Sequence, residues 1–313
     1  MRKYINVVLL GFIWSVYYTA AKVVNGQISP FSTGLIIRFT VFVAFTCMFV
    51  ARSRIKELFA VKPVAGYLIL IGCVGFLLDI TAFLGFRFAS SAATGTVLLK
   101  TDILITVLIS AFIYREKFTL KDCLLVACML AGVVMVMGVN PLDMRFQSSS
   151  ALFVLSALFV SINAFLIKRV QTQAVCAVSN ETIAYYNNFV AMIFFLASSF
   201  FFGTLKEAPV PLSHPKLAAA AAAGAASQFF VYVFYYKSLK RLPVWIVKVL
   251  LLLIPVFTLL TDAVLFGVIP GWYELAGTAI ILAGAFRMIT AKNRNSRPAG
   301  ENETENEPEK ETA

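Results

Sequence analysis

Seven ionisable side chains interrupt the long apolar stretches of this 313-residue sequence, and they define the chemistry that it could perform. They are Lys22, Arg38, Asp79, Lys100, Asp102, Lys248 and Asp262. A charged side chain at the centre of a helix in hydrocarbon costs about 2.5–3.5 kcal/mol, so each should face a protein interior or a water-filled path. Charges of both signs suit a zwitterionic or amphipathic solute, and a desolvated acid can carry a coupling proton.

The spacing of these charges along their segments predicts which of them meet. At 1.5 Å per residue, Asp79 and Lys100 lie about 10 Å and 12 Å from the same face of a membrane. We therefore predict an Asp79–Lys100 ion pair, or a shared solute-facing site. Asp102 lies about 15 Å deep and about 200° around the helix from Lys100, so one of the two should face a cavity and the other a partner helix. Lys248 either joins the site or snorkels to the nearer membrane surface.

Neutral polar and aromatic side chains extend the candidate binding surface. Amides such as Asn187 and Asn188 would be costly against lipid. Aromatic rings offer stacking surfaces for an apolar solute, but Tyr235, Tyr236 and Trp272 lie near segment ends, where interface anchors are expected. The predicted solute- or ion-binding residues are Lys100, Asp102, Asp79, Arg38, Trp14, Tyr18, Asn163, Gln228, Tyr232 and Lys248.

Residues that catalysis or metal binding needs are scarce. The single histidine, His214, lies between prolines, and the five cysteines show neither metal-ligand spacing nor a disulfide framework. The segment from Gly95 to Thr101 resembles a phosphate-binding loop but lacks the glycine before Lys100, so ATP hydrolysis is not indicated. We expect no enzyme activity, no metal and no cofactor.

Apolar segments of about 20 residues, the length a bilayer requires, must position these side chains. Hydrophobic residues make up 60% of the chain and charged residues only 14%, so most of it must be solvated by lipid. The sequence predicts an all-α polytopic membrane protein with ten transmembrane helices, multi-pass in the cytoplasmic membrane. The predicted spans are 4–25, 31–51, 64–86, 92–113, 118–138, 150–167, 182–202, 216–236, 244–267 and 271–290.

The loop cations alternate between the two sides of these spans and predict the orientation. One set of loops carries most of them, and the opposite set carries only Arg87, Arg145, Lys206 and Lys216. The positive-inside rule therefore predicts that both termini are cytoplasmic. The same pattern explains the net charge of +11, so nucleic-acid binding is not expected. Residues 291–313 are polar and acidic, which predicts a disordered cytoplasmic tail.

The two halves of the chain echo each other. Leu130-Ala131-Gly132 aligns with Leu282-Ala283-Gly284, and Lys22 aligns with Lys168. Because five helices per half is an odd number, the halves should insert upside down relative to each other, as in transporters built from inverted repeats.

Several motifs resemble those of the EamA-type drug/metabolite transporters. In the first half they are Trp14-Ser-Val-Tyr-Tyr-Thr-Ala-Ala-Lys22 and Tyr114-Arg-Glu-Lys-Phe-Thr119, and in the second half Leu242-Pro243 and Pro255-Val-Phe. The resemblance covers residues 1–290. The sequence departs from the family pattern where Lys100-Thr101-Asp102 lacks a neighbouring proline, and where Glu116 has no counterpart near Val268.

The resemblance implies two five-helix repeats, 1–140 and 150–290, followed by the tail. It implies a secondary active transporter that exports a small polar or amphipathic metabolite, with protons as a candidate coupling ion. The alternatives are an importer or exchanger of the same solute class, or a non-transporting membrane sensor or scaffold. The expected partners are the solute and the lipid bilayer, and both a monomer and a homodimer fit the sequence.

Overall fold

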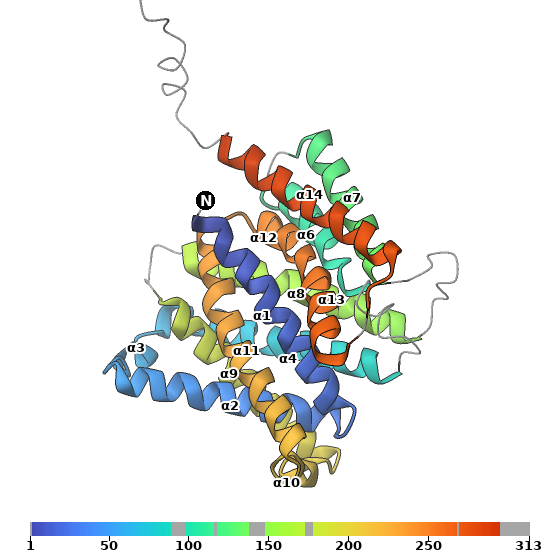
Figure 1. The fold of residues 1–313 in the computed structure, drawn as a ribbon. Coiled ribbons are helices and arrows are strands. Elements are labelled where there is room, and N and C mark those ends of the chain that lie inside the picture. The colour runs from blue at the N-terminus through green and yellow to red at the C-terminus, as the bar shows by residue number, and fades with distance from the viewer. Residues whose placement is uncertain are drawn as a thin grey trace, which may run out of the picture.

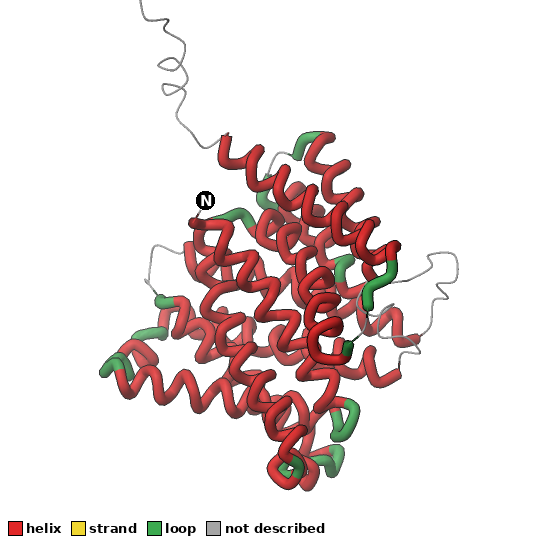
Figure 2. The backbone as a smooth tube through the Cα atoms, viewed as in Figure 1, coloured by secondary structure: helices red, strands yellow, loops and turns green. Residues whose placement is uncertain are grey.

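The computed structural model describes residues 2–88, 98–115, 118–137, 148–172, 178–267 and 269–294, and all elements within these ranges are helices (Figure 1). Short loops connect many of them (Figure 2). Eight helical segments are long and apolar enough to cross a membrane. They are α1 (Arg2–Asn25), α2 (Pro30–Ala51), α4 (Ala65–Phe88), α8 (Ser148–Thr172), α9 (Asn180–Phe201), α11 (Pro215–Arg241), the segment α12–η4–α13 (Val244–Leu250, Leu251–Leu253 and Ile254–Phe266) and α14 (Trp272–Arg294). The predicted class, an all-helical multi-pass membrane protein, is confirmed.

Two further helices occupy the predicted fourth and fifth spans. They are α6 (Asp102–Phe112), with 11 residues, and α7 (Leu120–Val136), with 17 residues. Both are shorter than the roughly 20 residues that a bilayer requires, and part of the predicted span 92–113 lies outside the described residues. Ten crossings therefore remain a prediction. The short helices α3 (Lys56–Phe59), η1 (Lys62–Val64), η3 (Leu205–Glu207) and α10 (Val210–Ser213) lie in connections.

The predicted ninth span is broken, which corrects the single helix expected over 244–267. Helix α12 ends at Leu250, a 3₁₀ turn follows, and α13 begins at Ile254. The cause is Pro255, which has no N–H to donate and whose ring excludes the carbonyl of Leu251. The break leaves Lys248 on the short helix α12, separate from α13.

Polar and apolar residues are distributed as expected for a bundle surrounded by lipid. Large apolar side chains such as Phe112, Phe201 and Val264 are about four-fifths exposed, whereas Arg38 and Lys248 are only 2% exposed. A soluble domain seldom buries charge and exposes aromatic rings in this way. The polar groups of the interior are therefore the features that call for a functional explanation.

Contacts between the two halves follow a two-fold pattern. Helix α1 packs on α11 as α8 packs on α4, α2 meets α11 as α9 meets α4, and α1 meets α13 as α8 meets α6. Helix pairs α2–α9, α6–α12 and α7–α14 each join corresponding helices of the two halves. Figure 1 shows α14 lying along α7 at one edge of the bundle. Exchanging the two halves thus reproduces the packing.

The repeated Leu-Ala-Gly motif lies at one of these self-corresponding contacts, between α7 and α14. A Cβ at Gly132 would lie 2.9 Å from the carbonyl oxygen of Gly277, and one at Gly284 would lie 2.4 Å from Cγ of Met129. Only glycine allows the two helices to approach so closely, as in other membrane helix pairs. The sequence repeat therefore marks equivalent packing positions.

Candidate functional site

The first buried polar cluster is centred on Arg38 of α2. Its guanidinium donates from Nε to Oδ2 of Asp79 at 3.0 Å and from Nη2 to the same oxygen at 2.5 Å. Asp79 lies on α4, and both side chains are nearly inaccessible, with 2% and 11% exposed. The ion pair joins α2 to α4 inside the bundle.

The remaining donors of Arg38 reach into the second half of the chain. Nη1 donates to the hydroxyl oxygen of Tyr232 on α11 and to Oδ1 of Asn188 on α9 at 3.3 Å, and Nη2 donates to the carbonyl of Gly75 at 3.3 Å. Asn188 is held by its own amide, which donates to the carbonyl of Ala184 at 2.8 Å. One guanidinium therefore links α2, α4, α9 and α11, which come from both repeats.

The second cluster is an ion pair between α6 and α12. Nζ of Lys248 lies 2.9 Å from Oδ2 of Asp102, and the two side chains are 1% and 12% exposed. Ser161 of α8 donates to the backbone carbonyl of Asp102 at 2.9 Å and is bonded to Thr106 at 3.1 Å. Helices α6, α8 and α12 are thus fixed around the second carboxylate.

Aromatic rings connect the two clusters. Tyr235 of α11 lies 5.7 Å from Nζ of Lys248, and its ring centre lies 5.4 Å from that of Trp14 and 6.1 Å from that of Tyr236. Tyr236 in turn lies 5.5 Å from Tyr232, which contacts Arg38. We call Trp14, Tyr18, Tyr232, Tyr235 and Tyr236 the aromatic layer.

Lys100 lies at the far end of the aromatic layer. Its Nζ is 6.0 Å from the ring of Tyr18, which neighbours Trp14 at 6.4 Å. Lys100 is 7% exposed, and none of the ion pairs between described residues includes it. The predicted Asp79–Lys100 ion pair is therefore wrong, because Asp79 is bound by Arg38. A depth estimate cannot identify which of two cations at similar depth faces the carboxylate.

Two other expectations are corrected. Lys248 does not snorkel to a membrane surface, because Asp102 holds it in the interior. Tyr235 and Tyr236 are 7% and 1% exposed and belong to the aromatic layer, so they are not interface anchors. Trp272 is 77% exposed, as an anchor would be.

The predicted amides have different surroundings. Asn163 donates from Nδ2 to the carbonyl of Ile71 at 2.8 Å and so joins α8 to α4. Asn187 donates to the hydroxyl of Tyr236 at 2.7 Å. Gln228 is buried, and its Oε1 has no hydrogen-bond partner among the described residues. The side chains of Lys22 and Asp262 lie outside the described part of the chain.

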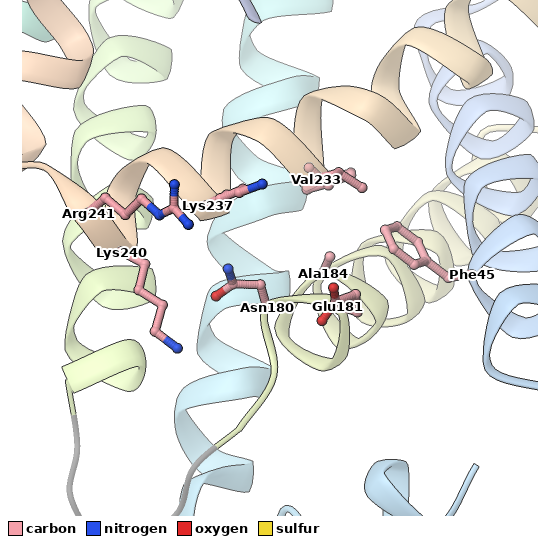
Figure 3. A pocket seen from close by; sticks show the side chains of 9 residues that line it. Phe45, Asn180, Glu181, Ala184, Val233, Lys237, Lys240 and Arg241 are labelled. Carbon is pink, nitrogen blue, oxygen red and sulfur yellow. The ribbon is translucent and has the colours of Figure 1, made fainter. Parts of the chain in front are cut away.

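A cavity of about 470 Å³ opens between the end of α2, the start of α9 and the end of α11 (Figure 3). Tyr232 is the predicted binding residue that lines this cavity. Because Arg38 donates to the hydroxyl of Tyr232, Arg38 lies directly behind that side chain. The other lining residues are Phe45, Asn180, Glu181, Ala184, Val233, Lys237, Lys240 and Arg241. The predicted spans 216–236 and 244–267 leave Lys237, Lys240 and Arg241 in a loop, whereas α11 extends to Arg241. The spacing of these cations, which places them on one helix face, was the missed signal.

At the opposite end, α2 and the α9–α11 connection are fastened together. The backbone N–H of Ser29 donates to Glu207 at 2.6 Å, and Ser32 donates to the carbonyl of Thr204 at 2.7 Å. The rings of Phe31 and Phe202 stack with their centres 4.6 Å apart. We call these contacts the α2 latch. The three helices are thus open at one end and closed at the other.

This arrangement defines a polytopic helical membrane protein with a polar, charged interior. A model of the EamA-like transporter family matches residues 1–138 and again residues 147–290, so the chain belongs to that family, whose function is small-solute transport. No curated protein matches the chain. A solved structure, titled only "Crystal structure of protein", is similar over 93% of this chain and 98% of its own, with a TM-score of 0.75 and 19% identity. That likeness supports the fold alone.

Proposed function

We propose that this protein is a secondary active transporter that exports a small polar or amphipathic solute across the cytoplasmic membrane. The observation that carries the proposal is the cluster of Arg38, Asp79, Asn188 and Tyr232, which joins both repeats beside a cavity. A polar cluster between two repeats is where transporters bind their substrates.

The cavity is the proposed entrance from the cytoplasm. It lies at the end of the bundle that carries Lys237, Lys240 and Arg241, which the positive-inside rule assigns to the cytoplasm. From Phe45, Arg38 lies seven residues deeper on α2, about 10 Å at 1.5 Å per residue. With the α2 latch closed, the protein is in an inward-open state.

Exchange of the two repeats gives the proposed outward-open state. In the inward-open state α4 packs tightly on α9, where a Cβ at Gly72 or Gly75 would meet Val190 or Asn187 at under 3.0 Å. The equivalent pair, α2 and α11, flanks the cavity. If the repeats are inverted, exchanging their conformations opens α4–α9 to the outside and closes α2–α11. In this proposal both termini are cytoplasmic, as the positive-inside rule predicts.

The buried ion pairs are proposed to act as polar contacts that solute binding or protonation rearranges. Each joins helices that the exchange must move: α2 with α4, and α6 with α12. Protonation of Asp79 or Asp102 would weaken the corresponding pair, which couples transport to a proton gradient.

Transport in proteoliposomes tests the proposal. A panel of zwitterionic, anionic, cationic and neutral metabolites is assayed with and without an imposed pH gradient. Wild type should transport part of the panel in a gradient-dependent manner, whereas Asp79→Asn and Asp102→Asn should lose that dependence. Lys206→Met, at an exposed position of η3, is the control and should behave as wild type. Failure to transport any member would overturn the proposal.

The α2 latch provides a second test. Glu207→Gln weakens the bond to the backbone of Ser29, and a hydrogen bond to a charged group contributes about 1.5–3 kcal/mol. The variant should shift the protein toward the outward-open state. In a background without native cysteines, Ser32→Cys should then react faster with an impermeant maleimide added outside. An unchanged labelling rate would contradict the assigned role of the latch.

A further inference from the structure

We propose that the solute carries a carboxylate, which binds to Lys100, and an apolar body, which packs against Trp14 and Tyr18. This inference rests on the proposed transport function and narrows its solute class. It follows from two independent features: an unmatched cation in the interior and a basic cavity entrance.

The buried charges of the described residues do not balance. Three buried cations, Arg38, Lys100 and Lys248, face two buried carboxylates, Asp79 and Asp102. Each carboxylate is within 3.0 Å of a cation other than Lys100. Residues 89–97, which precede Lys100 on the chain, contain no acid. Among the side chains that the structure describes, the buried cations therefore exceed the buried carboxylates by one.

Lys100 is the cation that the missing charge would satisfy. Arg38 already donates to four different groups, and Lys248 is bound to Asp102. The Lys100 ammonium lies 6.0 Å from the ring of Tyr18, a weak cation–π contact. The carboxylate of Asp102 also acts on it electrostatically, but that carboxylate is bound by Lys248 at 2.9 Å. A buried ammonium that shares one carboxylate with a second lysine is incompletely compensated, so the site is complementary to a monoanion.

The surroundings of Lys100 fit an apolar solute body. Tyr18 and Trp14 are half-buried, so part of each ring remains available, and Trp14 leads on to Tyr235. Rings of this kind stack on flat or aliphatic groups. Because the unmatched charge is single, a carboxylate fits better than a phosphate ester, which carries nearly two charges at neutral pH.

The residues that line the cavity entrance also favour an anionic solute. Lys237, Lys240 and Arg241 line it together with one acid, Glu181. That acid lies 3.9 Å from Arg54, which further reduces its negative field. In Figure 3 the basic side chains extend from α11 on one side of the cavity, and Asn180 and Glu181 stand on α9 across from them. An entrance lined mainly by positive charge raises the local concentration of anions and their rate of entry.

Equilibrium binding to the purified protein tests the inference without transport. The probes are three molecules of equal shape: 3-phenylpropionate, its amide, and 3-phenylpropylamine. Hexanoate, hexanamide and hexylamine form an aliphatic set. We expect each carboxylate to bind about tenfold or more tightly than its amide, since a charge-assisted bond replaces a neutral one.

Three lysine variants locate the effect. Lys100→Met should abolish the preference for the carboxylate, and Lys100→Arg should retain it. Neither leaves Asp102 unpaired, because Lys248 holds that carboxylate, so both should fold. Lys206→Met, on the exposed turn η3, should bind as wild type.

The possible outcomes separate this inference from the proposed function. Equal or tighter binding of the amide or amine, no binding of any carboxylate, or a preference that persists in Lys100→Met would overturn the inference. Carboxylate binding without transport of any solute in liposomes would support the inference and overturn the proposed function. Transport limited to cations or neutral solutes would support transport and overturn the inference.

Discussion

Replacing Asp79 by asparagine should destabilise this protein strongly. The mutation leaves the guanidinium of Arg38, 2% exposed, without the carboxylate that lies 2.5 Å from its Nη2. Removing one partner of a buried ion pair costs about 3–5 kcal/mol, because the remaining charge is uncompensated. At 1.4 kcal/mol per factor of ten, the ratio of folded to unfolded protein should fall about 100- to 4,000-fold.

Thermal unfolding of the detergent-solubilised protein measures this effect. The entropy of unfolding is about 2.1 cal/mol/K per residue, so in a chain of 313 residues 1 kcal/mol shifts Tm by about 1.5 °C, and a decrease of about 5–8 °C is expected. The double variant Arg38→Met/Asp79→Leu should recover most of the loss, because replacing both charges leaves neither uncompensated. The matched control is Arg54→Gln, at a pair whose side chains are 30% and 40% exposed, where the loss should be below about 1 kcal/mol.

Two results would refute this reasoning. One is an Asp79→Asn variant with the Tm of wild type, which would mean that the site is hydrated and the pair is screened. The other is a double variant no more stable than the single one, which would mean that packing rather than charge determines the cost.

Three more predictions follow from the same contacts. Lys248→Met should lower stability by about 3–5 kcal/mol and abolish transport, because it leaves a buried carboxylate unpaired; unfolding and uptake assays check this. Gly132→Leu should lower Tm, because a side chain would collide with a carbonyl oxygen 2.9 Å from its Cβ. Hydrogen bonding to Arg54 holds the pKa of Glu57 below its usual value, so this acid stabilises the fold above the unfolded-state pKa and loses that contribution as pH falls through the folded one. Glu57→Gln should therefore remove up to about 0.5 kcal/mol at pH 7 and nothing at pH 3 in denaturant unfolding.

The class of fold was predictable because hydrocarbon imposes strong rules on a sequence. Long apolar segments, and polar residues confined to their ends or to functional positions, are readable without a structure. The break at Pro255 was also readable, because proline removes a helix hydrogen bond wherever it occurs. The residues at the break, Leu251–Leu253, are all apolar. Hydropathy therefore predicts one continuous span, because it does not distinguish one helix from two.

The members of the site were easier to predict than their partners. Burial of charge in an apolar segment is expensive, so Arg38, Asp79, Lys100, Asp102 and Lys248 could be selected by type alone, and all five are buried. Which carboxylate faces which cation depends on helix rotation and neighbours, which depth along a span does not specify. The Arg38–Asp79 pair joins consecutive spans of one repeat, but Asp102–Lys248 joins spans of different repeats.

The position of that second pair links the site to the repeat. Helix α6 of the first half corresponds to α12 of the second half, and the two helices are in contact. If the halves exchange conformations, α6 and α12 exchange places, so Asp102 and Lys248 still face each other. The Arg38–Asp79 pair does not join two corresponding helices. Its helices α2 and α4 correspond to α9 and α11, which contribute the uncharged side chains of Asn188 and Tyr232. In the proposed exchange, the helices of the second pair therefore stay opposite each other, so protonation or solute binding is needed to separate Asp102 from Lys248, whereas the first pair has a different environment in each proposed state.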